Sequence, residues 1–157
     1  MQKITPCLWF NFNAEEAVNH YLGIFKRSRI MHISHYGDEA PERAGKALMI
    51  EFELEGQRFQ ALNGGPNLPF TQAISLSVDC TDQAEVDSLW QGLCVGGTEV
   101  QCGWLKDKFG VSWQIVPHRF FELMQAPDKV AVTRMMQAMF TMTKLDVAKL
   151  EAAFRSG

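Results

Sequence analysis

The chain has 157 residues, with 15 Lys and Arg against 18 Asp and Glu, for a formal net charge of −3 at pH 7. A chain of this length can bury roughly 70% of the surface that it exposes when unfolded, so its core needs no disulfide or metal. The small acidic excess gives no basic field of the kind that binds nucleic acid or an anionic membrane, which excludes both as predicted partners.

The N-terminal stretch and the cysteines predict a cytoplasmic protein. Residues 1–13, MQKITPCLWFNFN, turn polar too early for the apolar region of a signal peptide. No window approaches about 18 uninterrupted apolar residues, the length that spans a membrane as a helix. Without an export signal, and with no C-x-x-C pair, the single cysteines are expected to be reduced thiols. They are Cys7, Cys80, Cys94 and Cys102.

The first half of the chain predicts the order strand, helix, strand, strand, strand. These elements are expected over residues 4–10, 13–25, 29–36, 46–54 and 57–62. Asn13 and Glu16 hold the N-cap and N3 positions of the helix, as in a capping box. Within the second strand after the helix, apolar residues recur at every second position, which is typical of a half-buried strand. They are Leu48, Ile50, Phe52 and Leu54.

The second half repeats the design. The expected strand, helix and two further strand segments cover residues 73–79, 81–93, 98–105 and 111–116. Asp82 and Glu85 form the cap pair of this helix. Glu85 follows Glu16 of the first helix by the same number of residues as Trp90 follows Tyr21, as expected for an internal repeat. Each half is therefore interpreted as a β-α-β-β-β module. One domain over 1–157 is expected, divided into module one, a linker, module two and C-terminal helices at residues 1–63, 64–71, 72–117 and 118–157.

The C-terminal residues have no counterpart in module one. Pro127–Asp128 opens a helix that carries Val132 and a methionine stripe, namely Met135, Met136 and Met139. A second helix is expected around Val147, Leu150 and Phe154. We expect this helical pair to cover a sheet end or a dimer contact. The methionines are expected to fill the core, and an adaptable ligand-binding surface is the less favoured alternative.

Five stretches, in order along nearly the whole chain, resemble one known family. They are CLWFNFNAEEAVNHY, LNGGP, SVDCTDQAEVDSLW, CGWLKDKFGVSWQIVP and MMQAMFTMTKLDVAKLEAAF. The chain is similar to the PhnB-like family of the vicinal oxygen chelate (glyoxalase/bleomycin resistance/dioxygenase) superfamily, also labelled the 3-demethylubiquinone-9 3-methyltransferase family. The resemblance implies an α+β fold of two tandem modules that form a curved mixed sheet, a pocket on the concave side and a homodimer.

Strand periodicity predicts which side chains line that pocket. In the last strand Val111, Trp113 and Ile115 share the face that lies beneath a helix, so Ser112, Gln114 and Val116 point to the other face. In the strand before the second helix, Ile74, Leu76 and Val78 are expected to pack, with Ser75 and Ser77 pointing inward.

Metal-dependent members of the superfamily place His, Glu or Gln at four inward positions. By motif these positions fall on Ile4 or Pro6, on Ala61 or Asn63, on Ala73 or Gln72, and on Gln114. At most two or three neutral amides result, with no imidazole or carboxylate, and such donors do not offset the desolvation of a divalent ion. The prediction is therefore no metal and no cofactor.

The methyltransferase label has little support in the residues. A cofactor such as S-adenosylmethionine would usually need a doubly wound sheet with a glycine-rich turn between a strand and a helix. Here CLWFN continues into FNAEEA without a glycine, and the Gly-Gly pairs at 64 and 96 do not open a helix.

The favoured function is a metal-free protein that binds a small organic ligand in the concave pocket, with catalysis left open. A metal-dependent isomerase, lyase or dioxygenase, and a dimeric interaction module, are the alternatives. Polar and aromatic groups near the pocket are the candidate ligand-binding residues. They are Asn63, Gly64, Gly65, Gln72, Ser75, Cys102, Trp104, Ser112 and Gln114.

Overall fold

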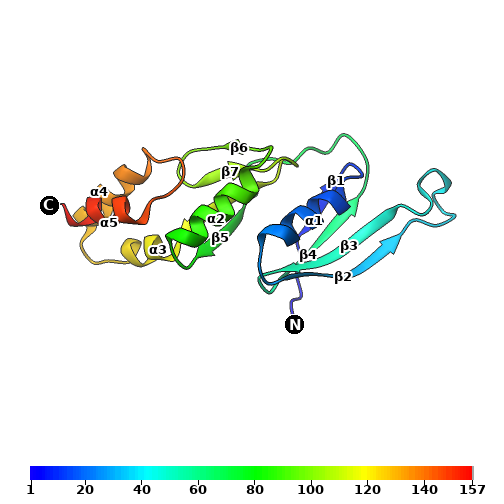
Figure 1. Cartoon of the computed structure of the whole chain (residues 1–157), viewed down its shortest axis with the longest axis horizontal. Helices are drawn as coiled ribbons and strands as arrows, with labels where there is room; N and C mark the ends of the chain where they lie inside the picture. The colour runs from blue at the N-terminus through cyan, green and yellow to red at the C-terminus, as the bar shows by residue number, and fades with distance from the viewer. Residues whose placement is uncertain (157) are drawn as a thin grey trace. The chain divides into compact units, whose positions relative to one another are not determined.

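A computed structural model describes residues 1–156 and divides the chain into two compact units, Met1–Phe70 and Thr71–Gly157. Each unit holds one four-stranded sheet with both parallel and antiparallel pairs. This α+β architecture, with one β-α-β-β-β module in each unit, confirms the predicted fold class (Figure 1). Within residues 1–156 no helix is both long and apolar enough to cross a membrane.

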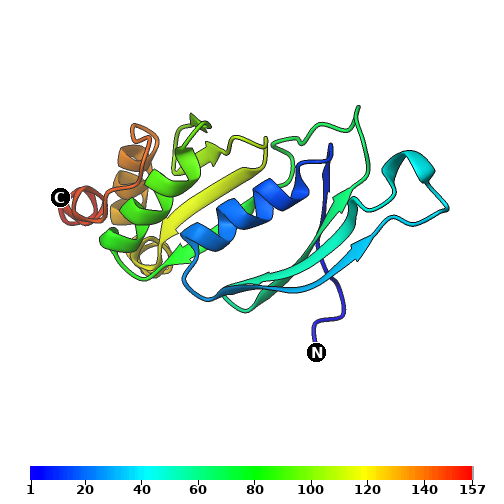
Figure 2. The same ribbon diagram turned by 45° about the vertical axis from the view of Figure 1, so that its right-hand side comes forward.

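The first unit contains β1, α1, β2, the 3-10 helix η1, β3 and β4. Their bounds are Cys7–Phe10, Ala14–Ile24, Ser28–His35, Pro41–Arg43, Ala47–Leu54 and Gln57–Asn63. The strand order is β1-β4-β3-β2, with β1 parallel to β4 and the other pairs antiparallel. Helix α1 lies along one face of this sheet (Figure 2).

The core of the first unit lies between α1 and that face. The apolar stripe of α1 is buried through Ala14, Ala17, Val18 and Tyr21. Phe10, Ile50, Phe52, Phe59 and Ala61 are the main buried residues of the sheet. The alternation predicted for β3 is confirmed from Ile50 onward, because Ile50, Phe52 and Leu54 are buried whereas Glu51 is exposed. At the start of the strand Ala47 is buried instead of Leu48, which is half-buried.

The start of α1 differs from the sequence prediction. Asn13 precedes the helix, but its side chain makes no capping hydrogen bond. The amide oxygen of Asn63, at the end of β4, accepts instead from the Ala14 N–H at 3.0 Å. A helix N-terminus needs an acceptor for its free N–H groups, and a residue distant in sequence supplies one here.

The second unit contains β5, α2, β6, β7, β8, α3, α4 and α5. Their bounds are Leu76–Cys80, Gln83–Cys94, Thr98–Glu99, Trp104–Lys106, Ser112–Pro117, His118–Met124, Lys129–Met139 and Val147–Arg155. The strand order is β5-β8-β7-β6, with β5 parallel to β8. The predicted Asp82 cap is confirmed, since its carboxylate accepts from the Glu85 N–H at 2.9 Å.

The core of the second unit forms where α2 covers one face of the sheet. Val86, Leu89, Trp90 and Leu93 of α2 are buried, as the helical stripe predicts. Val111, Trp113 and Ile115 are also buried, as predicted, and α2 packs against β8. Ser112 and Val116, which were predicted to point to the other face, are buried as well. Ile74, by contrast, is 73% exposed and precedes β5, so its predicted packing is wrong.

The segment predicted as one strand over 98–105 is a hairpin of β6 and β7. Cys102 and Gly103 have φ values of 62° and 82°, so the chain reverses there. A Cβ at position 103 would lie 3.0 Å from Leu145 and 3.1 Å from the Ile115 carbonyl oxygen. Glycine therefore permits both the turn and the close approach. The first strand of the chain is also shorter than predicted, because Ile4 and Pro6 precede β1.

The C-terminal helices are part of the second unit. Asp128 and Asp146 cap α4 and α5, as their side chains accept from Ala131 N–H and Lys149 N–H. One buried cluster joins these helices to β8 through Val116, Leu123, Met135, Met139, Leu145 and Leu150. The methionine stripe is core filler, and the extension covers one end of the sheet. Helix α3 was not predicted.

Backbone contacts hold the segment between α4 and α5 against the rest of the unit. Met142 and Thr143 carbonyl oxygens accept from the Cys102 and Gly103 N–H groups, both at 2.8 Å. Gln83 of α2 donates to the Leu145 carbonyl oxygen at 3.0 Å and accepts from the Val147 N–H at 2.8 Å. The side-chain amide of Gln83 thus makes two hydrogen bonds to the backbone here, one as donor and one as acceptor.

His118 at the start of α3 should titrate above the ordinary histidine range. Its Nδ1 lies 2.9 Å from an Asp79 carboxylate oxygen on β5, and this hydrogen bond, followed by the charges of Asp79 and Glu122, raises the pKa of His118. The pair stabilises the unit fully below the ordinary pKa of about 6.5 and loses this contribution as the pH rises through the raised pKa. NMR titration of the His118 ring should show the raised midpoint, and Asp79→Asn should lower it. A midpoint that is unchanged in Asp79→Asn would contradict this assignment.

Candidate functional site

The face of the second sheet opposite α2, here called the second open face, carries a polar row across three strands. The register pairs Ser77 of β5 with Gln114 of β8, and Gln114 with Trp104 of β7. Residues directly opposite in neighbouring strands point to the same face, so these three side chains share it. Gln114 is half-buried, and its amide nitrogen donates to the Ser75 hydroxyl at 2.9 Å.

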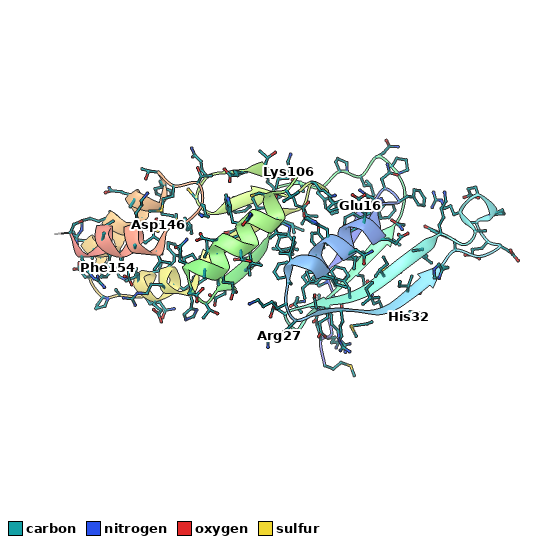
Figure 3. All side chains as sticks on the ribbon, in the orientation of Figure 1. Glu16, Arg27, His32, Lys106, Asp146 and Phe154 are labelled. Carbon is teal, nitrogen blue, oxygen red and sulfur yellow. The ribbon has the colours of Figure 1, made fainter. Side chains whose placement is uncertain are left out.

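The corresponding face of the first sheet, the first open face, carries a matching row. The register joins Cys7 to Gln60, Gln60 to Glu51, and Glu51 to His32 on the edge strand β2 (Figure 3). In both sheets the parallel pair joins the first and last strands of the module, so Cys7–Gln60 corresponds to Ser77–Gln114. This row was not predicted from the sequence.

The positions transferred from metal-dependent relatives fall elsewhere in the first unit. Ile4 and Pro6 lie outside β1, whereas Ala61 and Asn63 are buried on the helix-covered face. The alternation of β4, with Phe59, Ala61 and Asn63 buried, was the signal that could have identified Gln60 as a residue of the open face.

The donor set at the paired positions does not fit a divalent metal. In the first unit Cys7 and Gln60 offer one thiol and one neutral amide, and in the second unit Ser77 and Gln114 offer one hydroxyl and one neutral amide. Zinc sites and harder-metal sites are built from thiolate, imidazole or carboxylate donors that converge on one point. Among residues 1–156 there is no group of three or more His, Cys, Asp and Glu side chains that could hold an ion.

Asn63, Gly64 and Gly65 are engaged within the first unit. Besides accepting from Ala14 N–H, the Asn63 amide donates to Glu15 at 2.6 Å and to the Ala47 carbonyl oxygen at 3.0 Å. The Gly64 and Gly65 N–H groups donate to the Phe10 carbonyl oxygen at 3.1 and 3.4 Å. A ligand role for these three residues stays a prediction, and their donors have internal partners.

Glycine is required at position 64 by its neighbour. A Cβ there would overlap the ring of Trp9, whose indole N–H donates to the Gly65 carbonyl oxygen at 3.0 Å. The turn at Gly64 and Gly65, which are candidate ligand-binding residues, is therefore packed against an aromatic ring.

Four of the remaining candidate ligand-binding residues lie close to one another in the second unit. Ser75, Trp104, Ser112 and Gln114 belong to one sheet face or its border, and Ser112 is buried there. Gln72 is exposed in the segment before β5. Cys102 lies apart, because it packs against the cluster of the C-terminal helices.

Among the four cysteines, Cys80 and Cys94 have strongly raised pKa values. All four are free. Burial, with smaller contributions from nearby carboxylates, raises the pKa of Cys80 to about 12 and that of Cys94 to about 11. These two thiols are therefore neutral at physiological pH, and the neutral form is a poor nucleophile.

Comparison with known proteins places the two modules in a family. The family model described as 3-demethylubiquinone-9 3-methyltransferase matches residues 2–116. The PhnB protein from Bacillus cereus is 37% identical, covers 74% of this chain with 99% of its own length and superposes with a TM-score of 0.68. No curated protein matches the chain.

More distant structures are also similar to this chain. Protein PA1353 from Pseudomonas aeruginosa is 23% identical, with a TM-score of 0.62, and covers 74% of this chain with 98% of its own length. A glyoxylase/bleomycin resistance protein/dioxygenase domain from Frankia is 13% identical, with a TM-score of 0.46, and covers 74% of this chain with 92% of its own length. The family match ends at Val116, before α3, α4 and α5. With its paired modules and its match over residues 2–116, the chain belongs to the PhnB-like family that this model describes.

Proposed function

We propose that this chain binds a small organic molecule on the second open face, without a metal and without an assigned catalytic step. The observation that carries the proposal is the row formed by Ser77, Gln114 and Trp104. It combines hydrogen-bonding groups with a half-buried aromatic side chain, the combination that typifies small-molecule sites.

The Gln114 amide is positioned to recognise a polar group. Its nitrogen donates to Ser75, and no donor among residues 1–156 reaches its carbonyl oxygen. The bond to Ser75 fixes the amide orientation, so a hydroxyl or N–H group of a ligand would meet a pre-positioned acceptor. Trp104, directly opposite on β7, would contact the apolar part of the same ligand.

Methyl transfer, the reaction in the family description, has little support in the local geometry. The connection from β1 to α1 is Asn11, Phe12 and Asn13, and that from β5 to α2 is Thr81 and Asp82. Neither contains the glycines that let a backbone approach a nucleotide at a helix N-terminus. We therefore propose that this chain binds a ligand, and we assign it no transferase role.

The proposal includes a cytoplasmic homodimer. The family resemblance motivates the dimer, and the four free cysteines, which are typical of a reducing compartment, motivate the location. Met135 and Met139 are buried within the chain, so a dimer contact would use other surfaces.

A matched pair of glutamine variants tests the ligand site. Gln114→Leu removes the amide on the second open face, and Gln91→Leu makes the same change at an exposed position of α2. Small molecules released by solvent denaturation of the purified proteins would be quantified by mass spectrometry against protein concentration. We expect a stoichiometric compound in the wild type and in Gln91→Leu, reduced roughly tenfold in Gln114→Leu, since a lost buried hydrogen bond costs about 1–3 kcal/mol. Equal recovery from both variants, or no compound from any, would contradict the proposal.

A further inference from the structure

A cluster of two cations and two aromatic rings occupies the loops of the first unit. Phe12 lies between β1 and α1, Tyr36 follows β2, Arg43 ends η1, and Lys46 precedes β3. The loop that carries the last three is closed by backbone hydrogen bonds, because Tyr36 N–H donates to the Lys46 carbonyl oxygen at 2.9 Å and Gly45 N–H donates to the Tyr36 carbonyl oxygen at 3.1 Å. Its side chains are therefore held close to one another.

The two cations share one ring. The Arg43 guanidinium carbon lies 5.0 Å from the centroid of Phe12 and 5.4 Å from that of Tyr36, and the Lys46 ammonium lies 5.2 Å from the centroid of Phe12. Arg43 also donates to the Tyr36 hydroxyl at 3.3 Å, and that hydroxyl donates to the Asn63 carbonyl oxygen at 2.6 Å. Each contact lies within the range of an attractive cation–π interaction, about 6 Å.

The backbone at Phe12 is strained in a way that places this ring. Its φ is +60°, in the left-handed region that bulky side chains rarely adopt. Such a conformation is energetically unfavourable for a residue with a side chain and occurs preferentially at functional sites. Glycine or asparagine would adopt this conformation more easily. We infer that the strained backbone is retained because this position carries the phenylalanine ring.

The positive charge of the cluster is only partly balanced. Among residues 1–156 the one carboxylate in an ion pair with either cation is Glu42, 3.6 Å from Arg43 Nε on a side chain that is 70% exposed. Lys46 has no carboxylate partner in the described chain, although the protein as a whole is acidic, with a net charge of −3. The Arg43 side chain is 31% exposed, so its remaining donors are accessible from solvent.

We propose that Arg43 and Lys46 form an anion-binding site for the carboxylate or phosphate group of a small molecule. The guanidinium offers several donors in a planar fork, and the ammonium adds a point charge beside it. The bond from Arg43 to Tyr36 and the rings beneath both cations fix their positions before an anion arrives. This site lies outside the second open face, in the other unit, so it stands or fails independently of the proposed function.

Trp9 and Gly65 supply a spectroscopic reporter beside the cluster. An Arg43 Nη2 atom lies 3.4 Å from the position of a Cβ at Gly65, and the Trp9 indole N–H donates to the Gly65 carbonyl oxygen. An anion held by Arg43 should therefore perturb the Gly65 amide and the Trp9 indole signal.

NMR titration of the full chain tests the site. Inorganic phosphate and acetate would be added separately, with sodium chloride at matched ionic strength as the reference. We expect saturable shifts at Gly45, Lys46, Gly65 and the Trp9 indole with at least one of the two anions. Tighter binding of phosphate would assign the site to phosphate esters, and tighter binding of acetate would assign it to carboxylates.

Charge-removing variants complete the experiment. Arg43→Gln and Lys46→Gln should weaken anion binding roughly tenfold or more, because each removes a charged donor. Lys26→Gln, at an exposed position after α1 in the same unit, should bind as the wild type does. Lys46→Gln keeps Arg43, its rings and its hydrogen bond in place, so it separates anion binding from loop structure. Shifts that do not saturate, or that persist unchanged in Lys46→Gln, would overturn the proposal.

Discussion

Replacing Asp107 with alanine is expected to lower the free energy of unfolding of the second unit by about 3–5 kcal/mol. Asp107 is 2% exposed in the turn between β7 and β8. One carboxylate oxygen accepts from the Phe109 and Val111 N–H groups at 2.9 and 3.0 Å, and the other accepts from the Trp113 indole at 2.9 Å. Alanine would leave these donors without their acceptor, and unsatisfied buried donors are costly.

Urea unfolding followed by tryptophan fluorescence measures this effect. Asp107→Asn keeps one acceptor oxygen and should lose less stability than Asp107→Ala. Asp38→Ala, at an exposed loop position, is the control and should change stability by no more than about 0.5 kcal/mol. A loss in Asp107→Ala no larger than that of the control would show that the carboxylate does not organise the turn.

Replacing Leu145 with alanine is expected to cost about 2–5 kcal/mol, the range for a buried leucine. Leu145 is 1% exposed and belongs to the cluster that joins α3, α4 and α5 to Val116 of β8. Its side chain also lies close to Gly103 at the turn between β6 and β7. The cavity would therefore open where the C-terminal helices meet the sheet.

Val130→Ala provides the matched control, because Val130 is in α4 of the same extension but is 68% exposed. Thermal and urea unfolding of both variants should separate them by at least about 1.5 kcal/mol. Similar midpoints for Leu145→Ala and Val130→Ala would mean that the helices beyond the family match contribute little to the second unit.

Local patterns predicted α1, α2, α4, α5 and most strands, but not α3. The helices α1 and α2 and the alternation of β3 from Ile50 onward depend on residues near in sequence, and all three are confirmed. The hairpin of β6 and β7 was missed, because its reversal at Cys102 and Gly103 is favoured by contacts with the distant segment 142–145. Similarly, the cap of α1 comes from Asn63, which no local pattern indicates.

The residues of the candidate site could be predicted only where alternating apolar and polar residues fixed the orientation of the strand. In β8 the alternation of Trp113 and Ile115 with polar neighbours identified Gln114 correctly as a residue of the other face. In β4 the pairing with β1 and β3 sets the orientation, and Gln60 lies on the open face whereas Ala61 lies beneath α1. A shift of one residue exchanges the two faces, so the transferred position missed the row.

Native mass spectrometry of the purified chain, before and after addition of Zn²⁺ or Mn²⁺, tests the central claim most directly. The account predicts a mass increment from a small organic molecule on each chain and no stoichiometric metal after the addition. One metal ion per chain, retained through buffer exchange, would contradict it. That result would show that side chains of this protein form a metal centre and that a metal-dependent enzyme should be sought.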